Sequence, residues 1–129
     1  MKGNTNASVA AGTMVELQLP ANPSGMTLTK RDNRPIRAMR TGNMIHVHAA
    51  IVINGTFTGT TGWTQVLPAV DSLLAPGEAA MPPWLLYTPA SNQTFQMELL
   101  QGIYVYLTNS HTYNNIFLDI ELTWFVFKE

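Results

Sequence analysis

IYVYLTNSHTYNNIFLDIELTWFVFK, residues 103–128, is the stretch that decides the fold class. Apolar residues alternate with other residues in its first part, and the alternation returns after the polar turn 110–115. A period of two indicates strands that bury one face, and two such runs around a polar turn predict a hairpin. The residues expected on the buried face of the last strand are Leu118, Ile120, Leu122, Trp124 and Val126. The chain is therefore expected to be all-β, a compact antiparallel barrel or sandwich.

Composition narrows the classes of function. The chain has 129 residues, of which 46% are hydrophobic and only 12% are charged, about half the charge of an average soluble domain. Such a surface suits association with copies of itself or binding of neutral and polar ligands. The net charge of -1 excludes a generally basic nucleic-acid binder. The chain has no cysteine, which excludes a disulfide scaffold, a thiol nucleophile and a cysteine-ligated metal.

One domain accounts for this length. Residues 1–13 are small and polar and are expected to form a flexible lead-in to a single β domain, residues 14–129. The lead-in lacks the apolar core of a secretory signal. No stretch of the sequence reaches the length of a membrane span, so no membrane partner is expected.

Many short strands are expected before the C-terminal stretch. Gly, Pro and Asn turns separate them, which is typical of a sandwich or barrel. In the longest, 44–53, alternate apolar residues share one face, and Asn54-Gly55 after it is a strong hairpin signal. Residues 68–83 contain four prolines, too many for a helix interior or a central strand. The other expected strands are 14–19, 26–30, 36–40, 63–67, 84–88 and 94–100.

Five of the seven cations fall within residues 30–40. One interpretation is a patch for anionic groups, such as the phosphates of a surface polymer. The candidate contacts are Arg34, Arg37 and Arg40. The favoured alternative is that these charges keep a strand edge soluble or pair with Asp119 and Glu121, because alternate residues of a strand point to opposite faces.

His46 and His48 would share one face of a strand, about 7 Å apart. Such a pair can hold a metal if further ligands arrive, but no carboxylate occurs in residues 49–54. In a trimer the pair could instead point at the three-fold axis and form a site with six nitrogens. A half-buried pair among apolar neighbours is favoured over both, and no metal or cofactor is predicted.

Catalytic signals are weak. Asp119 and Glu121 share a strand face and could resemble a glycosidase carboxylate pair, although carboxylates on an exposed strand face are usually only solvated. The sequence contains no Gly-x-Ser-x-Gly elbow and no glycine-rich phosphate loop. A protein without catalytic activity is expected.

Aromatic and polar residues in expected loops indicate carbohydrate binding. Sugar rings stack on Trp and Tyr, while Asn, Asp and His bind hydroxyl groups. The residues with this chemistry are Asp71, Trp84, His111, Tyr113 and Asn114. The alternative for Trp84 and for Trp63 is an anchor in the core or at an interface.

Several segments share an order that is found in one protein family. They are Leu17-Gln18-Leu19-Pro20, the stretch 40–47 (RTGNMIHV), the stretch 62–68 (GWTQVLP), Pro82-Pro83 and the paired final strands. This layout resembles the C-terminal head domains of receptor-binding proteins from tailed phages of Gram-positive bacteria, notably lactococcal siphophages.

The resemblance implies a compact β-barrel head with three copies around an axis. It implies a non-enzymatic adhesin at the virion tail tip or baseplate that binds a host cell-wall saccharide or teichoic acid near subunit boundaries. Other tail proteins would then be its partners. Phe125 and Phe127 would point outward, and a symmetric trimer would cover them. The alternative is a structural trimeric fibre-tip or decoration protein with an axial metal on His46 and His48.

Overall fold

The computed structural model describes residues 14–68, 83–100 and 102–125. These residues form nine β-strands and one 3-10 turn, η2 (Arg31–Asn33), and contain no α-helix. The strands are β1 (Met14–Leu17), β2 (Met26–Lys30), β3 (Ile36–Thr41), β4 (Met44–Thr56), β5 (Gly62–Pro68), β6 (Trp84–Thr88), β7 (Gln93–Leu100), β8 (Gly102–Leu107) and β9 (Thr112–Phe125). The predicted all-β class is confirmed.

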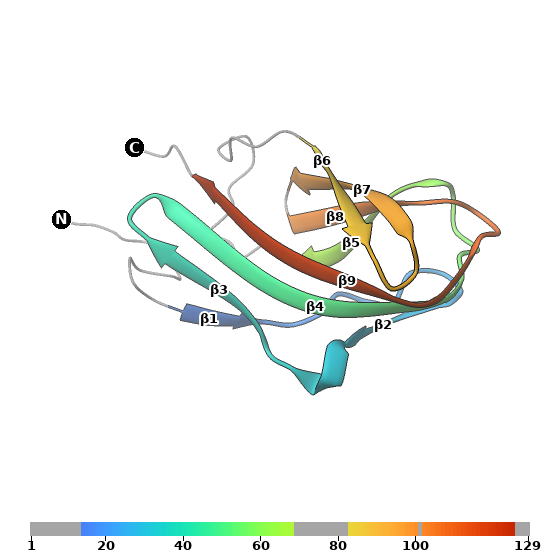
Figure 1. Cartoon of the computed structure of the whole chain (residues 1–129), viewed down its shortest axis with the longest axis horizontal. Helices are drawn as coiled ribbons and strands as arrows, with labels where there is room; N and C mark the ends of the chain where they lie inside the picture. Colours follow the sequence, from blue (N-terminus) through green and yellow to red (C-terminus); the bar gives the residue numbers. More distant parts are fainter. Residues whose placement is uncertain (1–13, 69–82, 101, 126–129) are drawn as a thin grey trace.

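The strands form two curled antiparallel sheets, arranged as a sandwich or half-barrel (Figure 1). Sheet A contains β1, β3, β4 and β2 in that order, with β9 paired to the other edge of β4. Sheet B has the order β5-β8-β7-β6. Neither sheet contains a parallel pair among the described strands.

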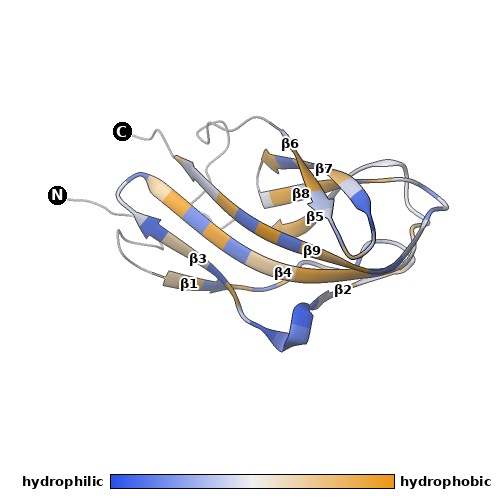
Figure 2. Cartoon of the chain, viewed as in Figure 1, coloured by the Kyte–Doolittle hydropathy of each residue, from blue (hydrophilic) through white to orange (hydrophobic). Residues whose placement is uncertain are grey.

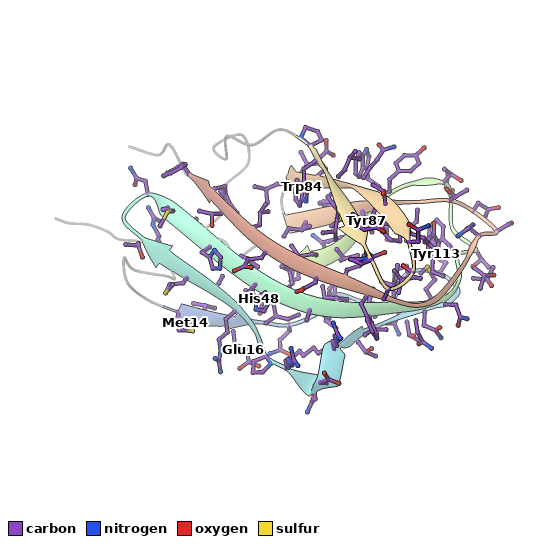
Figure 3. The ribbon with its side chains drawn as sticks, viewed as in Figure 1. Met14, Glu16, His48, Trp84, Tyr87 and Tyr113 are labelled. Carbon is purple, nitrogen blue, oxygen red and sulfur yellow. The ribbon has the colours of Figure 1, made fainter. Side chains whose placement is uncertain are left out.

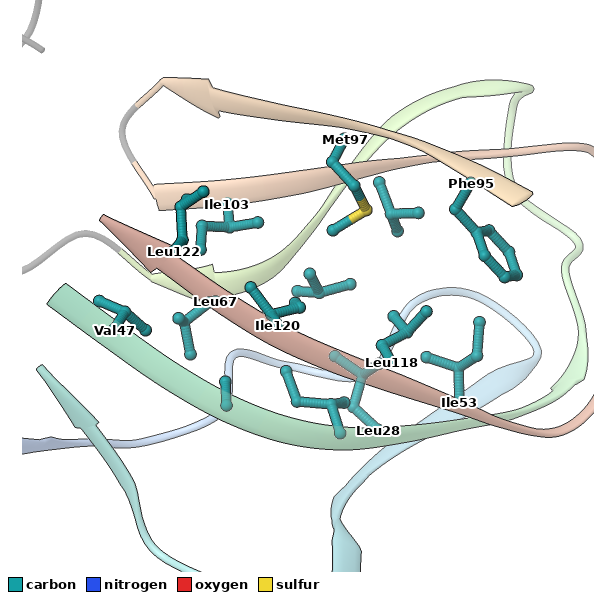
Figure 4. Close-up of a cluster of buried hydrophobic side chains, with 14 of the residues drawn as sticks. Leu28, Val47, Ile53, Leu67, Phe95, Met97, Ile103, Leu118, Ile120 and Leu122 are labelled. Atoms are coloured by element: carbon teal, nitrogen blue, oxygen red, sulfur yellow. The ribbon is translucent and has the colours of Figure 1, made fainter. Parts of the chain in front are cut away.

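The core lies between the two sheets and follows from alternation along the strands. The hydropathy bands along β4 and β9 in Figure 2 are the sequence pattern of period two seen in space. From sheet A, residues such as Ile51 and Leu118 point inward and are 0% exposed. Met97 and Val105 of sheet B meet them and are also 0% exposed. Figure 4 shows these apolar side chains filling the space between the sheets.

The two longest strands, β4 and β9, pair with each other along most of their length in sheet A. Their register places one buried side chain opposite another, as in Ile45 opposite Trp124 and Val47 opposite Leu122. The middle of the outer face carries polar pairs, such as His46 opposite Thr123 and His48 opposite Glu121, whereas Met44 opposite Phe125 at its end is apolar. A register shift by one residue would reverse both faces, so the apolar pattern itself fixes the pairing.

The predicted hairpin at residues 103–128 is wrong. β8 and β9 follow each other in the chain, but β8 pairs with β5 and β7 in sheet B, whereas β9 pairs with β4 in sheet A. The polar residues 112–115 belong to β9. Both strands bury one face in the same core from opposite sides. Alternation therefore identified the buried faces, but it could not identify the partners.

The hairpin signal at Asn54-Gly55 is wrong as well, because both residues lie within β4. They mark a β-bulge, in which Asn54 alone stands opposite Asn114 and Asn115 between two paired positions. The side-chain oxygen of Asn54 accepts a hydrogen bond from the Asn115 amide at 3.0 Å. Asn115 adopts φ = 50° and Gly55 φ = 121°, which are conformations that turns and bulges share.

Some expectations concern residues outside the described part of the chain: the lead-in 1–13, most of the proline-rich segment 68–83, Asp71, Val126 and Phe127. Within the described part, no helix is long and apolar enough to span a bilayer.

Candidate functional site

A cavity of about 510 Å³ opens at the end of sheet B where β7 and β8 cease to pair. Their ladder runs from Leu100–Gly102 to Met97–Val105 and stops there. Beyond it, β7 remains paired with β6 and β8 with β5 (Figure 1). The volume is typical of small-ligand pockets. The lining residues are Gln93, Thr94, Phe95, Gln96, Tyr106, Thr108, His111 and Tyr113.

Tyr113 reaches this cavity from the other sheet because of the bulge in β9. Even-numbered residues from Ile116 to Trp124 are buried, whereas Tyr113, before the bulge, is buried at an odd position. The extra residue therefore changes the phase of the strand and turns the Tyr113 ring inward. Figure 3 shows Tyr113 near the end of the molecule where the cavity opens.

Contacts fix the Tyr113 ring. Its hydroxyl oxygen accepts a hydrogen bond from the Thr108 amide at 3.0 Å. The His111 ring meets it edge-on with centroids 4.6 Å apart, and the Phe95 ring lies 5.9 Å away. Tyr113 is only 4% exposed, so it forms the floor of the cavity, whereas His111 is exposed at the rim.

The turn that carries His111 is held in place by the loop after β4. Ser110, at φ = 67°, donates its amide to the Phe57 carbonyl at 2.7 Å, and the Phe57 amide donates to the His111 carbonyl at 3.0 Å. The side chain of Asn109 donates to the Gly59 carbonyl at 2.7 Å. A turn with this many bonds presents its side chains in one arrangement before any ligand arrives.

The opposite wall is held by the β6–β7 hairpin. The Thr88 hydroxyl is 2.6 Å from the Ser91 hydroxyl and donates to the Gln93 carbonyl at 3.1 Å. The Tyr87 hydroxyl donates to the side-chain oxygen of Asn92 at 3.0 Å. These bonds fix the start of β7, from which four of the lining residues come.

The chemistry of the cavity suits a ligand with many hydroxyl groups. Each side-chain amide of Gln93 and Gln96 can donate and accept, and neither makes a hydrogen bond within the described part of the chain. The hydroxyls of Thr94 and Thr108 add further groups, and Tyr106 offers an aromatic ring. Among the residues that the structure describes, no Lys, Arg, Asp or Glu lines the cavity.

The structure brings two of the predicted saccharide residues, His111 and Tyr113, into the cavity. Asn114 is exposed on β9 beside them but does not line it. Trp84 does not join the group, because it points to the inner face of β6, packs against the core and lies opposite the buried Met97. Figure 3 shows Trp84 well away from Tyr113.

Sequence reasoning missed Gln96 and Tyr106, which lie in strands rather than loops. The signal that could have identified them is the alternation itself. It places Tyr104 and Tyr106 on the outer face of β8, and Gln96 on the outer face of β7.

The arginines do not form one patch. Arg34 pairs with Asp32 at 3.4 Å, and the Arg40 side chain donates to the Gly42 carbonyl at 2.7 Å. Arg37 points to the outer face of sheet A, whereas Arg40 follows the inward side of β3. The alternative reading, charges dispersed over an edge and a turn, agrees with this placement.

His46 and His48 share the outer face of β4, as predicted, but their neighbours are polar rather than apolar. The Nδ1 atom of His46 is 2.8 Å from the Thr123 hydroxyl, and its Nε2 atom is 3.6 Å from Glu121. His48 lies 3.3 Å from Asp119. The side chains are 34% and 54% exposed. His46 is half-buried as expected and His48 is exposed, but the expectation of apolar neighbours is wrong, because both rings contact polar side chains. The contact partners of Glu121 and Asp119 are thus His46 and His48 rather than arginines.

These four groups do not complete a metal site. Among the described residues, no group of three or more His, Cys, Asp or Glu side chains is placed to hold one ion. Asp119 and Glu121 also lie outside the lining of the cavity, so the geometry does not join them to a bound sugar there.

Comparison of the chain with models of protein families, with curated proteins and with solved structures found no match.

Proposed function

We propose that this chain is the host-recognition head of a phage tail adhesin and binds a cell-surface saccharide or teichoic-acid-like polymer without catalysis. The ligand would occupy the cavity between β7 and β8. The resemblance of the sequence layout to receptor-binding heads supports this role, as does the all-β fold. In the virion, other tail or baseplate proteins would hold the head.

The observation that carries the proposal is the make-up of the cavity. Two amides that make no hydrogen bond with the described residues, Gln93 and Gln96, line the same space as two threonine hydroxyls and three aromatic rings. Saccharide hydroxyls need both donors and acceptors, and the apolar faces of sugar rings pack on aromatic rings. The described lining contains no carboxylate, which favours binding over hydrolysis.

Exposed apolar side chains on sheet A support assembly into a homotrimer. Met14 stands opposite Met39, and Met44 opposite Phe125, at one end of its outer face. These four side chains are 38% to 54% exposed. Association would remove such a surface from water, and three copies of a weak saccharide site would bind a polymer more strongly than one.

The test is Gln96→Ala together with Tyr106→Ala. Purified variants would be applied to an array of bacterial glycans and to a panel of Gram-positive cells, and adsorption would be compared with that of the original chain. Loss of the hydrogen bonds of the Gln96 amide, or of the ring contact of Tyr106, should lower affinity by roughly tenfold. The matched control is Gln18→Ala, which removes an exposed glutamine outside the cavity.

Unchanged adsorption by Gln96→Ala and Tyr106→Ala, with the fold intact by circular dichroism, would exclude the cavity as the binding site. Release of free sugar from a glycan by the original chain would contradict the absence of catalysis.

A further inference from the structure

The charges of the chain are separated between its two sheets. The described cations, Lys30, Arg31, Arg34, Arg37 and Arg40, all lie in or between β2 and β3 of sheet A. In the described parts of 57–111, which contain all of sheet B, the only charged side chain besides the titratable His111 is Glu98. Glu98 lies opposite Tyr104 on the outer face.

Aromatic rings take the place of charges on the outer face of sheet B. Trp63 and Tyr106 stand opposite each other on β5 and β8 and are 40% and 38% exposed. Their ring centroids are 5.5 Å apart, and the rings are nearly perpendicular at 84°. Edge-to-face packing holds both rings in place, and part of each ring remains exposed to solvent. We call the exposed surface of Trp63 and Tyr106 the aromatic corner.

This aromatic corner and the cavity are continuous, because Tyr106 belongs to both. A ligand that fills the cavity and extends past Tyr106 would reach Trp63 next. The cavity supplies hydrogen bonds from Gln93 and Gln96, whereas the corner supplies ring surface. Together the cavity and the aromatic corner form one continuous surface that is longer than a single binding pocket. We call this surface the track.

We infer that this track binds an extended, uncharged oligosaccharide, with one sugar unit in the cavity and a following unit on Trp63 and Tyr106. The inference rests on the proposed function and narrows its ligand. Phosphate groups are bound by Arg, Lys or helix N-termini, and the described part of sheet B offers none of these. The carboxylate of Glu98 would repel a polyanion. A neutral wall polysaccharide is thus favoured over a teichoic acid.

The experiment uses the full chain on an array that carries neutral bacterial glycans, from single sugars to oligomers of several units, beside glycerol-phosphate and ribitol-phosphate oligomers. Binding should favour neutral glycans and strengthen from single sugars to oligomers. Trp63→Ala should weaken binding of the oligomers by roughly three- to tenfold and leave binding of single sugars nearly unchanged. The control is Leu100→Ala, which removes a comparably exposed apolar side chain from the end of the β7–β8 ladder far from the cavity.

Three outcomes would overturn the inference. Preference for the phosphate oligomers would refute the uncharged ligand. Equal loss of single sugars and oligomers in Trp63→Ala, or no loss in either, would refute the track while leaving the cavity in place. A change in molecular mass of Trp63→Ala by light scattering would identify the aromatic corner as a contact between copies. If the original chain bound no glycan at all, the proposed function itself would fail.

Discussion

The side chain of Asn54 on β4 accepts a hydrogen bond from the backbone amide of Asn115 on β9 at 3.0 Å, and this bond closes the bulge that turns Tyr113 toward the cavity. An interaction in sheet A thereby determines the shape of a site that opens in sheet B. Asn at this position provides an acceptor that few other side chains can place so close to the backbone.

Replacing Asn54 with Ala should therefore affect both stability and binding. The Asn115 amide would lose its partner, and the free energy of unfolding should fall by about 1 kcal/mol. Binding of saccharide should weaken as well, because Tyr113 loses its fixed orientation. Urea unfolding and titration with the array ligand would measure the two effects. Asn43→Ala, in the exposed turn between β3 and β4, should change neither.

Two glycines with positive φ should differ in their tolerance of a side chain. Gly25 has φ = 79°, and a Cβ there would collide with the Thr56 carbonyl oxygen. Gly42 has φ = 61°, with no atom within 4 Å of a Cβ. Gly42→Ala should cost about 1 kcal/mol for the left-handed conformation alone. Gly25→Ala should cost on the order of 3 kcal/mol. Equal losses in thermal or urea unfolding would show that the β4 end yields to the added methyl group.

Substitution of Trp84 should mainly lower stability, whereas substitution of Trp63 should mainly weaken binding. Trp84 packs against the core, so Trp84→Ala should lower the free energy of unfolding by about 2–3 kcal/mol while folded protein still binds. Trp63 is on the surface, so Trp63→Ala should cost about 1 kcal/mol or less. Denaturant unfolding of both variants checks this, and selective loss of binding in Trp84→Ala would restore the sequence-based prediction of a sugar contact there.

Phe125 should report on oligomerisation. It is 51% exposed beside Met44, on the apolar end of sheet A. Phe125→Asp would place a charge in the proposed contact between copies, so the mass measured by light scattering should shift from trimer to monomer. Thr29→Asp adds the same charge at the opposite end of that face and should leave the mass unchanged. A monomeric original chain would contradict the trimer.

Alternation in the sequence was sufficient to predict most strands and their faces. Ile45 to Ile53 and Leu118 to Trp124 are buried as the period of two requires, because burial of one face is a local property of a strand. Pairing depends on segments distant in sequence, so the local pattern predicts a partnership of β9 with β8, whereas its partner is β4. Asn54-Gly55 predicts a turn where the structure has a bulge, since turns and bulges both need unusual φ values.

The site was predictable only in part for the same reason. His111 and Tyr113 lie in or beside a polar turn, where local composition pointed to them. Gln96 and Tyr106 resemble ordinary outward residues of strands, and they become a site only because β7 and β8 separate beyond Met97. That separation depends on the partners of each strand, which the local pattern does not encode.

The cavity takes its walls from sheet B and its floor from β9 of sheet A. Neither layer contains it alone, so it comes into existence only when the two layers dock during folding. β9 is held in sheet A by its pairing with β4, which lies far away in the sequence, and such long-range pairings form slowly. A partly folded copy would therefore lack the proposed binding site, and only molecules in which both sheets have docked could bind a ligand there.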